Sequence, residues 1–252
     1  MKDAKTGFEP SNFTSLYELE SENFWFVVRN EFIKWSILKY KPNPASVLEI
    51  GCGTGFVTSM LRSELPDANI LASELHDEAL TFARNRVSGV EFITLNALEL
   101  GFDKEFELVG AFDVLEHIDD DVEVIKNVYT ALEKNGIFVL TVPQHKWLWS
   151  AADVHAKHAR RYDPNELESK LRRVGFSIEY TTSFVFVLLP IMSLSRLLSK
   201  KSGVNYSIEK ELKSSFLVDR VLRVLLRFDL LLAKLGANLP VGGSRLIVAR
   251  KS

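Results

Sequence analysis

An acid and three glycines stand at alternate positions near residue 50: Glu49, Gly51, Gly53 and Gly55. Apolar residues precede them and others follow at helical spacing, so the segment predicts a strand, a tight turn and a helix. Glycine has no Cβ, so it adopts positive φ angles without strain and lets a ligand lie against the backbone. In a doubly wound α/β fold, such a turn opens a nucleotide site at the carboxyl end of the first strand.

The spacing of the glycines narrows the kind of nucleotide. In the dinucleotide fingerprint G-x-G-x-x-G the third glycine would stand at position 56, which is Phe56. Glu49 would repel a pyrophosphate, whereas it suits a ligand with a cationic amino group. The pattern E-x-G-x-G-x-G resembles the first motif of class I S-adenosylmethionine-dependent methyltransferases. The resemblance implies that the turn packs against the amino-acid end and the ribose of that cofactor.

Further candidate cofactor contacts follow the next three predicted strands. Glu74 ends the second strand, about 20 residues beyond the glycine turn, where an acid accepts hydrogen bonds from ribose hydroxyls. Asn96 and Ala97 follow the third strand, and the resemblance implies that they lie beside adenine, with Asn in place of the commoner Asp. Asp113 ends the fourth strand and is assigned to the cofactor as well.

The segment 113–118, Asp-Val-Leu-Glu-His-Ile, resembles one common in small-molecule members of the family. The resemblance implies that it lines the space beside the sulfonium methyl group. His117 in this segment is one candidate catalytic base, because histidine accepts protons near neutral pH.

The loop over residues 143–163 contains the second candidate base, His158, in an H-x-x-R-R-Y segment that resembles a bacterial branch of these enzymes. Long ordered loops in compact domains are usually functional. The remaining aromatic and basic residues of the loop are candidate substrate contacts: Trp147, His155, Arg161 and Tyr162. Arginine binds a carboxylate or phosphate well. The alternative is a solvated loop whose tryptophans only close over the site.

Glu116, Asp119 and Asp120 form an acidic group of the kind that binds hard cations. Asp119 and Asp120 also stand where a side chain would cap the next helix, which is the preferred interpretation. There is no zinc-type cysteine spacing, so no metal is predicted.

The bulk composition limits the possible partners. The chain has 252 residues, 46% of them apolar, a net charge of -2 and one cysteine. No general basic field would attract nucleic acid, and no disulfide can form within the chain. The first ten residues have no signal-peptide pattern, and no uncharged apolar run reaches the length of a membrane span. A cytoplasmic protein is expected, with membrane contact at most peripheral.

The predicted fold is a doubly wound, mostly parallel seven-stranded sheet of the Rossmann-like methyltransferase type. Four segments are expected: an N-terminal helical lid over 1–40, a cofactor-binding core over 41–183, a helical insert over 184–240 as a substrate lid, and the last strand over 241–252. The N-terminal segment is expected to form two helices that break near residues 21–23, and Arg29 is expected to be solvated.

Residues 216–235 predict an amphipathic helix with cations on one face and Leu and Val on the other; the cations are Arg220, Arg223, Arg227 and Lys234. Such a helix can lie on an anionic membrane or pack its apolar face on its own domain. Together these features predict methyl transfer from S-adenosylmethionine, giving S-adenosylhomocysteine, to oxygen or nitrogen of a small or amphiphilic, lipid-like acceptor. A non-catalytic donor-binding regulatory protein and a dinucleotide-dependent oxidoreductase remain as alternatives.

Overall fold

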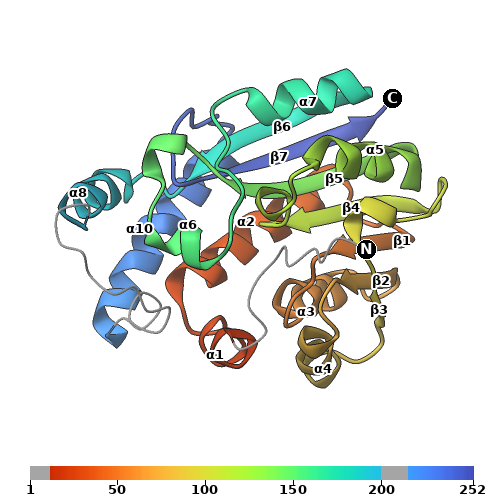
Figure 1. The fold of residues 1–252 in the computed structure, drawn as a ribbon, viewed down its shortest axis with the longest axis horizontal. Helices are drawn as coiled ribbons and strands as arrows, with labels where there is room; N and C mark the ends of the chain where they lie inside the picture. The colour runs from red at the N-terminus through yellow and green to blue at the C-terminus, as the bar shows by residue number, and fades with distance from the viewer. Residues whose placement is uncertain (1–11, 200–214) are drawn as a thin grey trace.

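A computed structural model describes residues 12–199 and 215–252. The first eleven residues of the expected N-terminal lid and residues 200–214 of the expected insert lie outside these ranges. Seven strands form one sheet in the order β3-β2-β1-β4-β5-β7-β6 (Figure 1). The strands are β1 (Ser46–Ile50), β2 (Asn69–Glu74), β3 (Glu91–Thr94), β4 (Phe106–Phe112), β5 (Leu132–Pro143), β6 (Phe176–Phe184) and β7 (Ser244–Lys251).

Strands β1 to β5 are parallel to one another, whereas β7 runs antiparallel to both β5 and β6. This confirms the predicted fold class of a mostly parallel seven-stranded sheet. Since parallel strands end at one edge of a sheet, the segments that follow β1, β2, β3 and β4 meet there.

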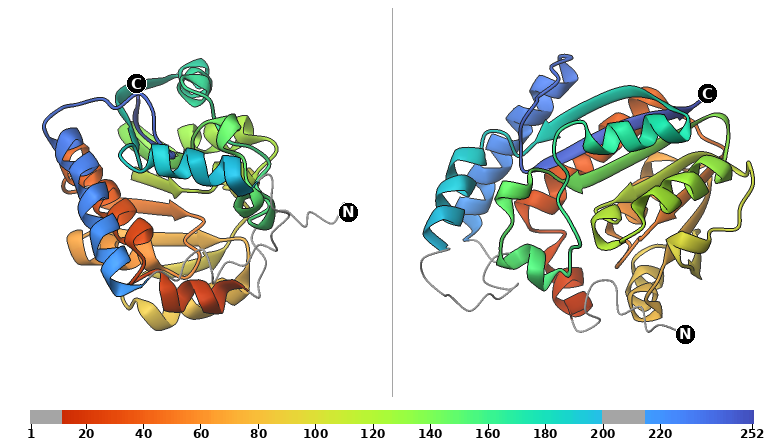
Figure 2. Two further views of the ribbon diagram at one scale, coloured as in Figure 1. Left: turned by 90° about the vertical axis from the view of Figure 1, so that its left-hand side faces the viewer. Right: turned by 45° about the horizontal axis from the view of Figure 1, so that its top comes forward.

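Helices cover both faces of the sheet, so its strands are buried on two sides, as parallel sheets require (Figure 2). One face packs against α2 (Phe24–Tyr40), α3 (Phe56–Glu64) and α10 (Phe216–Lys234). The other packs against α5 (Asp121–Ala131) and α7 (Glu166–Val174). The remaining helices are α1 (Phe13–Leu19), α4 (Asp77–Arg86), α6 (Ala151–His155) and α8 (Leu189–Ser199), with short 3-10 turns η2 (Ala97–Glu99), η3 (Leu115–His117) and η4 (Lys146–Leu148).

The two expected N-terminal helices are present as α1 and α2. Asn23 separates them, and its side chain accepts a hydrogen bond from the Trp25 amide as the cap of α2. Val28, Phe32 and Ile33 of α2 are fully buried against the sheet. Helix α2 is therefore a core helix, and its first turns lie at the carboxyl edge of the strands.

Helix α10 differs from its expected pattern of one basic and one apolar face. It packs along α2 through Leu226, Leu230 and Ala233, and Arg227 forms an ion pair there with Glu31. A second apolar face points outward; its exposed members are Leu217, Val221, Val224, Phe228, Leu231 and Leu235. The cations therefore border two apolar faces. Of the helices in the described ranges, none combines the length and the apolar content needed to cross a bilayer.

Candidate active site

A cavity of about 630 Å³ opens at the carboxyl edge of the sheet. This volume lies within the ~300–1,000 Å³ typical of small-molecule sites. The segments that follow β1, β2, β3 and β4 line it on one side, and α1, the first turns of α2, α6 and α8 line the other. The cavity therefore has a sheet end and a helical end.

The glycine turn forms the floor of the sheet end, and all three of its glycines have positive φ angles. A Cβ on Gly51 would lie 2.5 Å from Cγ2 of Val114, and one on Gly55 would lie 3.0 Å from Ala83 of α4. A Cβ on Gly53 would meet no atom within 4 Å among the described residues. Gly51 and Gly55 thus allow close packing, whereas Gly53 leaves room above the turn for a ligand.

Glu49 lies beneath this turn, 1% exposed, and accepts a hydrogen bond of 2.6 Å from the Thr58 hydroxyl of α3. Burial raises the pKa of Glu49 to about 7, although the Thr58 hydrogen bond acts in the opposite direction. A cationic group in the cavity would favour its charged form.

Glu74 is held against the turn by backbone amides. Its carboxylate accepts hydrogen bonds from Gly53 at 3.0 Å, Leu75 at 2.8 Å and His76 at 3.2 Å. Asn96, which caps η2 through the Leu98 amide at 3.0 Å, also lines the cavity, as does Ala97. All eight predicted cofactor residues except Gly55, which packs on α4, line this cavity; they are Glu49, Gly51, Gly53, Glu74, Asn96, Ala97 and Asp113.

Asp113 connects the two ends of the cavity. It has a φ angle of +58° directly after β4 and forms an ion pair with Arg29 of α2. The Arg29 guanidinium also lies 4.8 Å from the centre of the Trp25 ring and 5.4 Å from that of Phe26. The expectation of a solvated Arg29 is therefore wrong: the side chain lines the cavity and is 8% exposed, because Asp113 and the two rings offset the loss of water.

Glu116 and His117 come from η3 and face the helical end. Glu116 is completely buried, and neither carboxylate oxygen has a hydrogen-bond partner among the described residues. Burial, followed by the charge of Asp113, raises the pKa of Glu116 well above its usual range. Burial, followed by the nearby His158 ring, lowers the pKa of His117 to about 4, so His117 is neutral at pH 7.

His158 is oriented by a buried carboxylate. Asp153 lies 3.0 Å from its Nδ1 and accepts a second hydrogen bond, of 2.7 Å, from Nε of Arg161. Burial alone would raise the pKa of Asp153, but the His158 hydrogen bond and the Arg161 charge hold it well below its usual range. A charged acceptor at Nδ1 keeps the proton there, so the lone pair of His158 is on Nε2.

A protein-family model described as a methyltransferase domain matches residues 28–181, more than half of the chain. The chain belongs to this methyltransferase family. The match covers every strand from β1 to β5 together with Glu116, His117 and His158, whereas α1, the start of α2 and α8 at the helical end lie outside it.

Relatives of this chain match it over part of its length. A probable S-adenosylmethionine-dependent methyltransferase of Mycobacterium tuberculosis is 26% identical over 162 residues, which are 63% of this chain and 58% of that protein. A malonyl-[acyl-carrier protein] O-methyltransferase of Acetivibrio thermocellus is 28% identical over 101 residues, which are 39% of this chain and 36% of that protein. The chain thus spans little more than half the length of the first relative and about a third of the second.

A solved structure extends the likeness of fold to nearly the whole chain. A chain of the complex between the Haloferax volcanii Trm112 methyltransferase activator and the putative methyltransferase superposes with a TM-score of 0.63. It is 14% identical and covers 94% of this chain and 96% of that one. At this identity the likeness concerns the fold alone.

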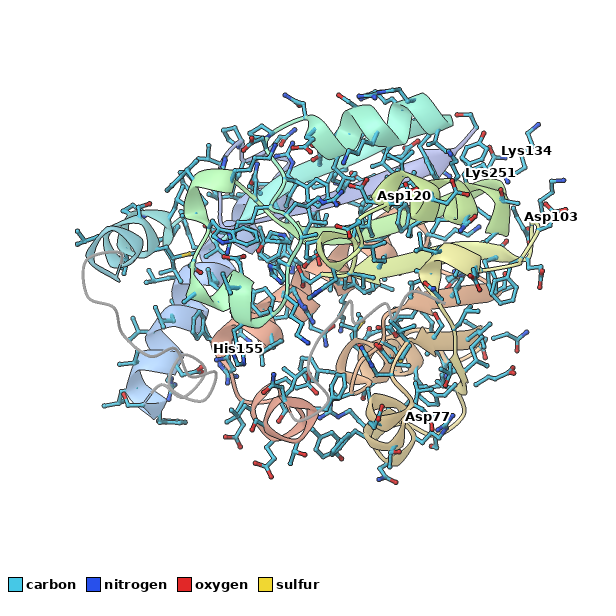
Figure 3. The ribbon with its side chains drawn as sticks, viewed as in Figure 1. Asp77, Asp103, Asp120, Lys134, His155 and Lys251 are labelled. Atoms are coloured by element: carbon cyan, nitrogen blue, oxygen red, sulfur yellow. The ribbon has the colours of Figure 1, made fainter. Side chains whose placement is uncertain are left out.

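The predicted substrate residues divide into two groups. His155 and Arg161 line the cavity. His155 stands on the side of α6 that faces α1, with Nε2 3.4 Å from the Asn12 amide (Figure 3). Trp147 and Tyr162 do not line the cavity: Trp147 is 53% exposed on η4, and Tyr162 is buried in the core with its hydroxyl 2.7 Å from Asp121. Their expected contact with substrate has no support from their positions.

The sequence did not predict a role in the site for Arg29 or Asp153. It grouped Glu116 with Asp119 and Asp120, whereas in the structure Glu116 alone is buried at the cavity. Each of Arg29, Glu116 and Asp153 is a charged residue in an apolar or aromatic stretch of the sequence. A charge in such a stretch suggests that it is buried and paired, and this was the available signal. Asp120 behaves as expected, because its carboxylate accepts from the Glu123 amide at 3.0 Å and caps α5.

Proposed function

We propose that this protein transfers the methyl group of S-adenosylmethionine to oxygen or nitrogen of a small, amphiphilic acceptor. The main support is that one cavity has the glycine turn, Glu49 and Glu74 at one end, and His117 and His158 at the other. Donor and acceptor would meet between them, beside Asp113. Placing the two reactants in line supplies much of the rate enhancement of such a reaction.

The donor occupies the sheet end in this proposal. The carboxylate of Glu49 offsets the charge of the donor's amino group, and Glu74 accepts from the ribose hydroxyls. Asn96 and Ala97 lie where the adenine would be, at the start of η2. Gly53 contributes the open backbone over which the donor lies.

The acceptor atom attacks the methyl carbon with a lone pair. The bond between carbon and sulfur breaks, and its electron pair stays on sulfur, which changes from a sulfonium to the neutral thioether of S-adenosylhomocysteine. The acceptor proton leaves toward the cluster of Glu116, His117 and His158. Of the two histidines, His158 is the better oriented, because Asp153 fixes its tautomer.

The acceptor end combines apolar walls with two guanidinium groups, which suits an amphiphile with an anionic or carboxylate group. Its apolar lining comes from α2 and the segment before and within α8, and includes Phe24, Trp25, Val185, Leu188 and Met192. Arg29 and Arg161 are each paired with an acid, and their remaining N–H groups can donate hydrogen bonds to the acceptor. The name of the Acetivibrio relative, a malonyl-[acyl-carrier protein] O-methyltransferase, is in line with oxygen as the acceptor atom.

In this proposal the N-terminal helices and the insert act as lids over the cavity. Glu20, at the end of α1, accepts hydrogen bonds from Thr54 in the glycine turn and from Arg86 of α4. These contacts hold α1 against the donor end, while Leu188 and Met192 cover the opposite wall. Opening either lid would admit the acceptor.

The outer apolar face of α10 is proposed to rest on an anionic membrane. Its exposed residues recur at spacings of four and three, and Arg220 and Lys234 are exposed along one border. A helix with an apolar face bordered by cations suits the interface of anionic lipids. An amphiphilic acceptor could then reach the cavity from the membrane surface.

The deciding experiment follows labelled methyl groups from S-adenosylmethionine into a cell extract, which is then separated into organic and aqueous phases. Organic-phase label that depends on the protein is the expected result. The control is Gly53→Arg, whose long side chain would fill the open space above the turn and block the donor. Label only in water would exclude the lipid-like acceptor, and tight donor binding without any label would favour the non-catalytic alternative.

A further inference from the structure

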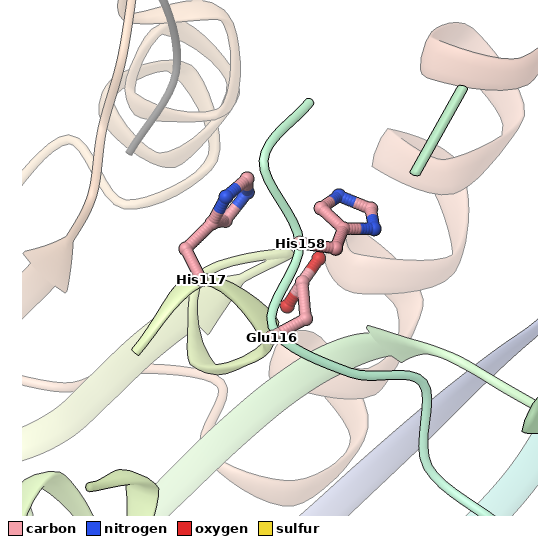
Figure 4. A group of neighbouring side chains, drawn as sticks. All are labelled: Glu116, His117 and His158. Carbon is pink, nitrogen blue, oxygen red and sulfur yellow. The ribbon is translucent and has the colours of Figure 1, made fainter. Parts of the chain in front are cut away.

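Three potential metal ligands meet at the helical end of the cavity, from two separate segments. Glu116 and His117 come from η3, and His158 comes from the segment after α6 (Figure 4). One ligand atom of each lies within 4.8 Å of the others, and the two imidazole rings are 4.7 Å apart at their centres, edge to face. Such convergence of two histidines and a carboxylate is the ligand set of many catalytic metal sites.

Three buried polar atoms of this cluster lack hydrogen-bond partners among the described residues. Glu116 is 0% exposed, and both of its oxygens are without a hydrogen bond among the residues that the structure describes; the same holds for Nδ1 of His117. Burying an unpaired carboxyl group is costly, so these atoms indicate a ligand that the protein chain itself does not provide.

We propose that Glu116, His117 and His158 bind a first-row divalent cation such as Zn²⁺, Fe²⁺ or Mn²⁺, with open coordination positions that face the cavity. Two imidazoles favour such ions over Mg²⁺ and Ca²⁺, which prefer oxygen ligands alone. Tetrahedral ligands at ~2.1 Å from zinc are about 3.4 Å apart. The ligand atoms, now within 4.8 Å of one another, would therefore have to approach by up to about 1.4 Å, through side-chain rotation.

The surroundings of the cluster fit a metal site in two respects. Asp153 holds Nδ1 of His158, as a carboxylate commonly orients a metal-binding histidine through its other nitrogen. The cations near Glu116 are Arg29 and Arg161, which would oppose a metal ion. Each of them is paired with an acid, Arg29 with Asp113 and Arg161 with Asp153, so the charge of Glu116 is left for the ion.

The consequence for catalysis rests on the proposed function. An acceptor hydroxyl bound at an open position would lose its proton more easily, because the ion stabilises the resulting anion. The ion would then do the work otherwise left to the free Nε2 of His158. Binding of the ion itself requires neither donor nor acceptor, so it can be tested alone.

The test is calorimetric titration of the chelator-treated protein with Zn²⁺, and with Co²⁺ followed by its visible spectrum. One ion per chain is expected, with at least a tenfold loss of affinity in Glu116→Gln and in His158→Ala and a 10–100-fold loss in Asp153→Asn. The matched control is His155→Ala, a histidine of the same cavity outside the cluster, which should bind as the wild type does. Cys52→Ser should do so too.

Two results would overturn the proposal: no ion bound by the wild type, or equal affinity in the wild type, Glu116→Gln and His158→Ala. Thermal unfolding of each variant shows whether it is folded. If Glu116→Gln does not fold, a Zn²⁺-dependent rise in the melting temperature of the wild type that is absent from His158→Ala decides the matter instead. Failure of the site would leave methyl transfer with His158 as the base unaffected.

Discussion

The two ends of the cavity differ in how far the protein satisfies their buried carboxylates. At the donor end, Glu74 accepts three backbone hydrogen bonds and Glu49 one from Thr58. At the acceptor end, Glu116 and Nδ1 of His117 are buried without partners in the described part of the chain. The donor end is thus formed in advance, whereas the acceptor end is complete only with a ligand.

This difference separates binding from turnover. Changes at the donor end should alter affinity for S-adenosylmethionine, because the carboxylates there are proposed to contact the donor and not the acceptor. Changes at the acceptor end should alter the rate of transfer with little effect on donor affinity. Variants at each end can therefore test whether the two ends are independent.

The largest effect is expected from His158→Ala. Loss of a proton acceptor or of a metal ligand should reduce the turnover rate about 10²–10⁴-fold, while affinity for S-adenosylhomocysteine stays within about twofold. Single-turnover transfer of labelled methyl groups and calorimetry measure the two quantities. A large loss of donor affinity would contradict the independence of the two ends.

Asp153→Asn should have a smaller effect of the same kind. The Asn amide lacks the negative charge with which Asp153 accepts the Nδ1 hydrogen bond of His158, so it holds the ring less firmly. The turnover rate should therefore fall about 10–100-fold. Because Asp153 is a positioning residue, the pH profile of turnover should shift as well. A drop in melting temperature without any change in that profile would show that Asp153 is merely structural.

Glu49→Gln tests the donor end. A hydrogen bond to a charged group contributes about 1.5–3 kcal/mol, so donor affinity near pH 7.5 should fall about 10–100-fold. Turnover at saturating donor should change much less. Calorimetry with S-adenosylhomocysteine measures the affinity, and Thr58→Ala, which leaves the carboxylate in place, is the matched control.

The pKa of Glu49 gives this prediction a pH dependence. The folded-state pKa of about 7 is above the usual 4.5, so the folded protein holds a proton that the unfolded chain has lost. The contribution of Glu49 to the unfolding free energy therefore declines as pH rises from 4.5 to 7. A cationic donor favours the ionised acid, so wild-type affinity should increase from pH 6 to 7.5, and Glu49→Gln should show no such increase.

The donor end could be predicted from sequence because its parts are local. Strand, glycine turn and helix follow one another within residues 47–65, and the periodicity of the chain specifies their order. Glu74, Asn96 and Asp113 follow from the rule that parallel strands end at one edge.

The acceptor end depends on contacts between distant segments. Arg29 meets an acid 84 residues away, and nothing near Arg29 in the sequence indicates that pairing. Trp147 and Tyr162 have the right chemistry for a substrate site, but the directions of loop side chains depend on packing. The Tyr162 hydroxyl donates a hydrogen bond to Asp121, 41 residues earlier, and the side chain is buried in the core.

The smallest effect on folding is expected from a substitution on the outer face of α10, which packs on α2 beyond the acceptor end. Phe228→Ser should change the unfolding free energy by less than about 0.5 kcal/mol, because the ring is 51% exposed. The matched variant on the inner face is Leu230→Ala, at 5% exposure, which should cost about 2–5 kcal/mol.

Phe228→Ser should nevertheless weaken binding to vesicles that contain anionic lipid, because it removes apolar area from the face of α10 that is proposed to enter the membrane interface. Co-sedimentation with anionic and with zwitterionic vesicles measures this, with turnover on a water-soluble acceptor as a check that the cavity is intact. Equal sedimentation of Phe228→Ser and wild type on anionic vesicles would exclude α10 as the contact. The acceptor would then enter the cavity from water, past α1 or α8, and the outer face of α10 would have no part in bringing it there.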